Sequence, residues 1–170
     1  MVAVRKSVEE TKVALHGVVR EMYDRIVKGD PPTMTLPVRT KNNIGFDAKL
    51  GVYKYGKKQT IRDATSLGSA KQLLRALHVI EFIEAMIDDG KSSTLREMYY
   101  ISEGWGLGKF QSQNESNNLA EDLEIVTRCL REDFKLRPEE DGSRMIGNIT
   151  LRERNRKGQW MRINARDDVG

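Results

Sequence analysis

The sequence predicts an α+β protein in which an N-terminal helix and a small β segment are followed by three helices and a β-hairpin. Apolar residues recur at helical spacing over residues 7–28 and 69–89. Stretches typical of short strands, separated by turn residues, occupy residues 33–63 and return after Pro138. A chain of 170 residues is long enough for one well-packed core or two small lobes.

The composition narrows the class of protein. Charged residues make up 32% of the chain and hydrophobic residues 38%, which is typical of a soluble globular protein. No apolar run reaches the roughly 20 residues that cross a bilayer, and the N-terminus lacks the apolar core of a signal peptide. We therefore expect a cytoplasmic protein with no membrane partner. Cys129 is the only cysteine, and His16 and His78 lie far from any cysteine pair, so we expect neither a disulfide nor a zinc site.

Residues 7–28 are expected to form the first helix. Ser7 followed by Glu10 is the signature of a capping box, and Gly29 with Pro31 stops the helix. A helix in this position either packs on its own domain or docks on a partner. Packing is the default, so residues 1–32 are interpreted as an N-terminal helix and a possible docking arm.

The segment 33–68 is expected to be a small β unit. The pattern predicts a strand at Thr33–Val38 and a hairpin made of Leu50–Tyr55 and Gln59–Arg62, with the turn at Gly56-Lys57-Lys58.

Positive charge dominates this β segment, where Asp47 is the only acidic residue before Asp63. A solvated hairpin and a phosphate-facing surface explain the charge equally well. The basic residues are Arg39, Lys41, Lys49, Lys54, Lys57, Lys58 and Arg62.

Three helices follow, joined by short loops. The first, residues 69–89, carries an apolar stripe wide enough to form the core of a domain. The second is residues 94–103, where Thr94 followed by Glu97 is a second capping box. The third is expected to run from about Asn118 to Phe134.

A β-hairpin is predicted after the third helix, with strands at Met145–Glu153 and Gln159–Asn164. Three helices followed by a basic hairpin is the order of a winged helix, whose third helix enters the major groove and whose wing contacts the DNA backbone. We therefore expect residues 69–166 to form a winged-helix DNA-binding domain. The candidate DNA-binding residues of the wing are Arg152, Arg154, Arg156, Lys157 and Arg162.

The third helix is less suited to reading bases, because Glu121, Asp122 and Glu124 would repel phosphates. This departure favours an enzyme that uses the winged-helix frame to present a reactive group over a regulator that reads sequence.

The reactive group is expected on the helix at 94–103, which carries two adjacent tyrosines. Helical spacing places Tyr99 on the apolar stripe with Leu95 and Met98, and it places Tyr100 on another face with Arg96. A phenol is a poor nucleophile at neutral pH and needs a nearby cation or base. Arg96 supplies a cation and also has the planar fork that grips a phosphate. Surface decoration is the alternative interpretation of this Arg–Tyr pair.

The stretch Thr94-Leu95-Arg96-Glu97-Met98-Tyr99-Tyr100 resembles the A subunit of archaeal topoisomerase VI, a family shared with the protein that makes meiotic DNA double-strand breaks. The likeness extends to residues 36–44 and 110–116. In that family the second tyrosine of the pair attacks the DNA backbone and stays on the 5′ end, which implies that Tyr100 is the nucleophile. The resemblance also implies that Arg96 belongs to the active site. Phe110 and Gln113 match a family motif, and Gln113 is a further candidate DNA contact.

The resemblance implies cofactors and partners that this chain does not itself hold. Mg²⁺ would sit in a Toprim domain that follows the winged helix, with residues 167–170 as the start of a linker, so the chain looks like an N-terminal fragment without a metal site. ATP would be bound by a B subunit. The intact enzyme would be an A₂B₂ assembly, containing an A-subunit homodimer, that breaks one DNA duplex and passes another through it on the nucleoid.

We therefore interpret the chain as the tyrosine-bearing, DNA-cleaving portion of an ATP-dependent type IIB topoisomerase, inactive alone. Two alternatives stay open: a non-catalytic winged-helix regulator and a break-forming member of the same family. A pure interaction module that uses the first helix for docking is a further class.

Overall fold

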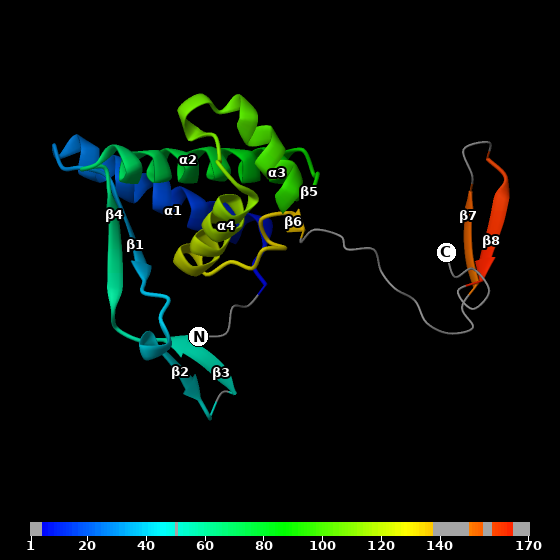
Figure 1. Ribbon diagram of the computed structural model, residues 1–170, viewed down its shortest axis with the longest axis horizontal. Coiled ribbons are helices and arrows are strands. Elements are labelled where there is room, and N and C mark those ends of the chain that lie inside the picture. The colour runs from blue at the N-terminus through cyan, green and yellow to red at the C-terminus, as the bar shows by residue number, and fades with distance from the viewer. Residues whose placement is uncertain (1–4, 50, 138–149, 155–157, 165–170) are drawn as a thin grey trace. The chain divides into compact units, whose positions relative to one another are not determined.

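The computed structural model describes residues 5–49, 51–137, 150–154 and 158–164. Its internal contacts divide the chain into two compact units, Met1–Glu139 and Glu140–Gly170. The described residues form helices and small two-stranded sheets, in agreement with an α+β class (Figure 1). None of the described helices is both long enough and apolar enough to cross a membrane.

Helix α1 spans Val8–Val27 and begins at the predicted capping box. The amide of Ser7 donates to the Glu10 carboxylate over 2.8 Å, and the amide of Glu10 donates back to the Ser7 hydroxyl. Its face bearing Leu15 and Met22 is buried against α2 (Leu67–Asp88), α4 (Gln113–Thr127) and β1 (Thr33–Pro37). The packing expected of this helix is therefore present.

The three later helices exist as predicted, but the bounds of the third were wrong. Helix α2 spans Leu67–Asp88, α3 spans Leu95–Ile101, and two short 3₁₀ turns, η2 (Ser102–Gly104) and η3 (Gly106–Gly108), follow α3. Helix α4 spans Gln113–Thr127, so it starts before the predicted Asn118 and ends before Phe134.

Local chemistry explains the shift of α4. Its first turn is wholly polar and gives no apolar signal. The helix ends at Arg128, which has the left-handed backbone conformation with φ 56°. Glycine is the usual residue in this conformation at a helix end, and a glycine there would have indicated the end in the sequence. Residues 131–135 then form tight turns that bring the fully buried Phe134 back to the core.

The predicted hairpin of the β segment was wrong, although its strands exist. Strand β4 (Gln59–Asp63) pairs with β1 (Thr33–Pro37), and β3 (Val52–Tyr55) pairs with β2 (Ile44–Asp47), which was not predicted. The chain thus forms a nested ribbon, with the 3₁₀ turn η1 (Lys41–Asn43) between β1 and β2. Figure 1 shows the β2–β3 hairpin at the end of the β1–β4 ribbon that lies away from the helices.

One asparagine interrupts the ribbon and explains the error. Asn43 is buried, and its side-chain amide donates to the carbonyls of Val38 and Lys58, each over 2.9 Å. Gly56 passes so close that a Cβ there would lie 2.5 Å from the Asn43 side-chain oxygen. Gly56 is therefore a close-approach glycine and not a turn, and the turn is made at Gly51, whose φ is +66°.

Two further sheets complete the described structure. In the first unit, β5 (Ser93–Thr94) pairs in parallel with β6 (Leu136–Arg137). In the second unit, β7 (Thr150–Arg154) pairs with β8 (Trp160–Asn164) in an antiparallel hairpin, as predicted. Residues 145–149 of the predicted first strand lie outside the described residues. The hairpin expected to act as the wing thus falls in a unit separate from the helices, and the winged-helix arrangement itself is not shown.

The core of the first unit lies between α1, α2, α3 and α4. Its largest fully buried side chains include Phe110, Phe134, Ile83, Met98 and Leu123. Because Met98 belongs to α3, this core fixes the helix that carries the two tyrosines.

Candidate active site

Helix α3 presents Tyr100 beside Arg96, as the helical spacing predicts. The Nε–H of Arg96 donates to the Tyr100 hydroxyl over 3.2 Å, and the guanidinium carbon lies 5.8 Å from the centre of the phenol ring. Tyr100 is 55% exposed. A hydroxyl that is open to solvent and held by a fixed cation is available to an anionic substrate.

Tyr99 has a different environment. It is half-buried and packs on the core, and its ring centre lies 5.5 Å from that of Tyr100. The predicted division of roles between a packing tyrosine and a presented tyrosine therefore matches their exposure.

The start of α3 is fixed by its cap. The amide of Glu97 donates to the Thr94 hydroxyl over 3.0 Å, and the Glu97 carboxylate accepts from the Ser93 hydroxyl over 2.8 Å. Ser93 and Thr94 also form β5, which is bound to β6. The first turn of this short helix is therefore tied to a strand from the far end of the unit.

The loop after α3 is held by two buried polar residues that the sequence pattern did not single out. Ser102 donates to the carbonyl of Tyr99 over 2.6 Å and accepts from the amide of Phe110 over 3.2 Å. Arg75 on α2 donates to the carbonyl of Lys109 through Nε and Nη2, over 3.1 and 2.7 Å. Its guanidinium also lies 5.7 Å from the centre of the Phe110 ring.

A sequence signal for Arg75 existed, because it is the single charged residue among Leu73, Leu74, Ala76 and Leu77. An arginine on an apolar stripe is rarely buried unless it is paired.

Phe110 is 1% exposed, so its role in this structure is packing.

The second predicted contact of this region, Gln113, lies in the first turn of α4. Its side-chain amide donates to Asn117 over 2.9 Å and to the Ser116 hydroxyl over 3.3 Å. The structure thus places Gln113 in a local polar network, and it shows no contact between Gln113 and Tyr100.

The carboxylates of α4 have protein partners. The buried Asp122 accepts from both Arg39 and Arg62, and Arg39 also pairs with Glu121 over 2.7 Å. Arg131 pairs with Glu124 over 2.8 Å. Two cations of the β segment are thus bound to α4, which removes them from the predicted phosphate-facing surface.

The described residues contain no group of three or more His, Cys, Asp or Glu side chains arranged to hold a metal ion. Asp88 pairs with Lys12, and Asp89 pairs with Lys91 over 2.7 Å. The acidic runs at 139–141 and 167–168 lie outside the residues whose side chains are described.

The cationic hairpin β7–β8 places two predicted DNA contacts directly opposite each other. Arg152 pairs in register with Arg162, and both are exposed. Arg154 lies across from Trp160, which is 64% exposed. Like charges directly opposite on a sheet are unfavourable unless an anion lies between them. The remaining candidates, Arg156 and Lys157, lie outside the described residues.

Comparison with known proteins gives two matches to family models. Residues 71–136 match a model described as type IIB DNA topoisomerase. Residues 139–170 match a model described as an all-beta domain in the DNA topoisomerase VI alpha subunit. The boundary between the two matches coincides with the division of the chain into two units.

Individual relatives cover nearly the whole chain. It is 44% identical over 164 residues to the A subunit of type 2 DNA topoisomerase 6 from Haloarcula marismortui, an alignment that takes in 95% of this chain and 44% of the relative. The identity is 46% over 152 residues to the protein of the same name from Natronomonas pharaonis, covering 88% of this chain and 41% of that protein. The protein of that name from Archaeoglobus fulgidus is 45% identical over 157 residues, an alignment that covers 92% of this chain and 43% of that protein. The chain thus spans less than half the length of these relatives.

Proposed function

Because the chain belongs to the type IIB DNA topoisomerase family and is related over most of its length to A subunits of topoisomerase VI, we propose that it carries the DNA-cleaving tyrosine of such a protein. The observation that supports this most directly is the exposed Tyr100 hydroxyl held by Arg96. The reaction would be a reversible transesterification on duplex DNA.

In this reaction the Tyr100 oxygen attacks a backbone phosphorus, and the bond from phosphorus to the 3′ oxygen breaks. The phenol proton leaves Tyr100, and the departing 3′ oxygen takes up a proton. The products are a 5′-phosphotyrosyl end and a 3′ hydroxyl, and the reverse attack by that hydroxyl reseals the strand. Arg96 would bind the non-bridging phosphate oxygens and stabilise the negative charge that develops on them.

The carboxylates and histidines of the described residues form no group that fits Mg²⁺. We propose that Mg²⁺ is bound by a Toprim domain and ATP by a B subunit, both outside this chain. The A subunit would act as a homodimer within an A₂B₂ assembly, in the cytoplasm on the nucleoid, and this chain alone would not cleave DNA.

We further propose that α2, α3 and α4 form the frame of a winged helix, with residues 150–164 as a DNA-contacting wing. The parallel pairing of β5 with β6 supports this, because β5 precedes α3 and β6 follows α4, so the two strands join the ends of this helical segment. Arg152 and Arg162 would bind phosphates from one face of the hairpin, and Gln113 would contact DNA from α4.

The test is to trap the covalent intermediate. The chain, joined to its Toprim domain and mixed with a B subunit, is incubated with supercoiled plasmid, Mg²⁺ and a non-hydrolysable ATP analogue, and the reaction is stopped with detergent. After nuclease digestion, mass spectrometry should find a nucleotide on Tyr100.

Tyr100→Phe should abolish this adduct, and Tyr99→Phe, the matched control, should retain it. Adduct yields from Tyr100→Phe equal to those of the parent would contradict the proposal. Plasmid binding with no adduct in any variant would instead favour a non-catalytic winged-helix regulator. Adduct formation without ATP-driven relaxation would favour a break-forming protein.

A further inference from the structure

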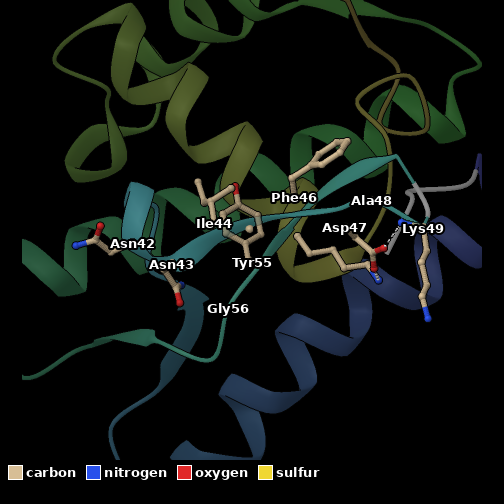
Figure 2. Close-up of a pocket in the computed structure, with 11 residues that line it drawn as sticks. Asn42, Asn43, Ile44, Phe46, Asp47, Ala48, Lys49, Tyr55 and Gly56 are labelled. Carbon is tan, nitrogen blue, oxygen red and sulfur yellow. Dashed lines mark hydrogen bonds and ion pairs between the residues drawn. The ribbon is translucent and has the colours of Figure 1, made fainter.

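The β2–β3 hairpin carries an apolar face that nothing in the described structure covers. Residues in register on an antiparallel pair point to the same side, so the pairs Ile44–Tyr55 and Phe46–Tyr53 share one face. Figure 2 shows Ile44, Phe46 and Tyr55 on one side of the hairpin, with Asp47 and Lys49 on the other. The four apolar side chains are 38–74% exposed.

Exposing such an apolar face to water is unfavourable. A two-stranded hairpin is only marginally stable in water, and an exposed aromatic face usually marks a binding site for another molecule. The rings of Phe46 and Tyr53 lie 5.2 Å apart and contact each other. The aromatic side chains of the apolar face thus already contact each other in the chain without a partner.

The hairpin is also held firmly at its base. Asn43 bridges the carbonyls of Val38 and Lys58 and accepts the amide of Lys58 over 3.0 Å, and Gly56 donates its amide to the carbonyl of Asn43. This brace joins the β2–β3 hairpin to the β1–β4 ribbon. Because the ribbon is bound to α4 through Asp122, the hairpin is presented on a fixed support.

The charge of the segment that carries the hairpin indicates the chemistry of a partner. Residues 38–62 contain seven basic residues and one acidic residue. Arg39 and Arg62 are bound to Asp122, and Lys54 pairs with Asp47 over 2.6 Å. The cations left over are exposed and have no ion-pair partner among the described residues: Lys41, Lys49, Lys57 and Lys58.

We infer that the β2–β3 hairpin is a second DNA-contacting element, which enters a groove of duplex DNA. A two-stranded ribbon fits the major groove, and apolar side chains of architectural proteins wedge between base pairs from the minor groove. Phe46 and Tyr53 would contact sugars and base edges, and the lysines would bind the flanking phosphates. A protein partner would need an acidic rim around an apolar centre, whereas duplex DNA supplies both features along its whole length.

This inference rests on the proposed function only in taking DNA as the substrate. The hairpin contains no residue of the tyrosine site, so it would bind DNA whether or not Tyr100 cleaves. Failure of one proposal is therefore distinguishable from failure of the other.

The test uses photo-crosslinking with the full chain. p-Benzoylphenylalanine replaces Tyr53, which is 74% exposed, and in a matched control it replaces Ile61 on β4, which is 63% exposed. Each variant is irradiated with a labelled 30-base-pair duplex, alone and in the presence of the B subunit. The inference expects a DNA crosslink from position 53 at least several-fold stronger than from position 61. A crosslink from position 53 to a second copy of the chain or to the B subunit, with none to DNA, would overturn it.

Equilibrium binding supplies the second measurement. Replacing Lys49, Lys57 and Lys58 together by glutamine should lower the slope of log affinity against log salt by about 2 to 3, because each phosphate contact contributes roughly 0.9. Phe46→Ala with Tyr53→Ala should weaken binding roughly tenfold and leave the salt slope unchanged. An unchanged affinity and slope in both variants would contradict the inference, provided that the parent binds the duplex. A parent with no affinity for the duplex would contradict the proposed function as well.

Both sets of variants are expected to fold, because their side chains are exposed and lie outside the core. Matching circular dichroism spectra and melting temperatures for variants and parent would show this.

Discussion

The hydroxyl of Tyr100 receives its hydrogen bond from Arg96, and this pair gives the sharpest test of the chemistry. Arg96→Gln removes both the charge and the planar fork that grips a phosphate, so adduct formation in the full assembly should slow by about 100-fold. Arg96→Lys keeps the charge without the fork and should give an intermediate rate. The rate is measured by quenching the adduct with detergent at timed intervals.

The matched control for Arg96 is Lys28→Gln, which removes one charge from the exposed end of α1. It should leave the rate of adduct formation unchanged. A rate for Arg96→Gln equal to that of the parent would show that the arginine is surface decoration.

A single buried carboxylate joins the β ribbon to the helices. Asp122 is 3% exposed and accepts from Arg39 and Arg62, whose side chains are roughly one-third exposed. Removing the charge from a buried ion pair is strongly unfavourable, and partial solvent screening of the arginines reduces the effect. Asp122→Asn should therefore lower the free energy of unfolding by about 2 kcal/mol, as measured by urea denaturation.

Glu121→Gln provides the comparison, because it removes the neighbouring charge from a side chain that is half exposed. Its effect should stay below about 1 kcal/mol. Equal unfolding free energies for Asp122→Asn and the parent would mean that the ribbon is held by other contacts.

The capping box of α1 allows a test on one helix. Ser7→Ala removes the hydroxyl that accepts the Glu10 amide and should cost about 1 kcal/mol of stability. The backbone N–H and the hydroxyl of Ser7 also donate to the Glu10 carboxylate and hold its pKa below the ordinary value of a glutamate.

The sign of the pH effect follows from this lowered pKa. A carboxyl that is more acidic in the folded state stabilises the fold at pH values above its unfolded pKa, and this contribution is lost as the pH falls through the folded pKa. NMR titration should show the Glu10 pKa moving upward in Ser7→Ala. Glu9→Gln, in the same turn, should leave the Glu10 pKa low, and an unmoved Glu10 pKa in Ser7→Ala would refute the role of the cap.

The helices were predictable because their signals are local. The start of a helix is indicated by a capping pair, Ser7 with Glu10 for α1 and Thr94 with Glu97 for α3. The spacing of apolar residues then indicates which helix face is buried. The pairing of Arg96 with Tyr100 depends only on a separation of four residues, so it was predicted too. Helix α4 shows the limit, since its polar first turn and its end at Arg128 carry no such signal.

Strand pairing in the β segment 33–63 was not predictable in the same way, because it depends on contacts between residues far apart in the sequence. Nothing local distinguishes Gly56, which makes room for Asn43, from a glycine that forms a turn. The buried Asp122 and Arg75 likewise find their partners 60 and 34 residues away along the chain. These contacts determine how the tyrosine helix and the ribbon are supported. The spacing of apolar residues along the sequence does not indicate them.

The division of the molecule into two units leads to the last prediction, a truncation after residue 139. All the buried apolar residues of the described core belong to residues 1–139. The truncated chain should therefore keep its helical circular dichroism and unfold in one cooperative transition at a urea midpoint close to that of the full chain. The removed hairpin is a two-stranded sheet of the kind that contributes little stability on its own.

DNA binding should respond differently to the same truncation. Arg152 and Arg162 are lost with five further cations, which are Arg144, Arg154, Arg156, Lys157 and Arg166. The salt slope of duplex binding should fall by roughly 0.9 for each phosphate contact removed, while the binding supplied by the β2–β3 hairpin remains. A truncated chain that unfolds at much lower urea would show that the second unit supports the first. A truncated chain with an unchanged salt slope would show that the cationic hairpin does not contact DNA.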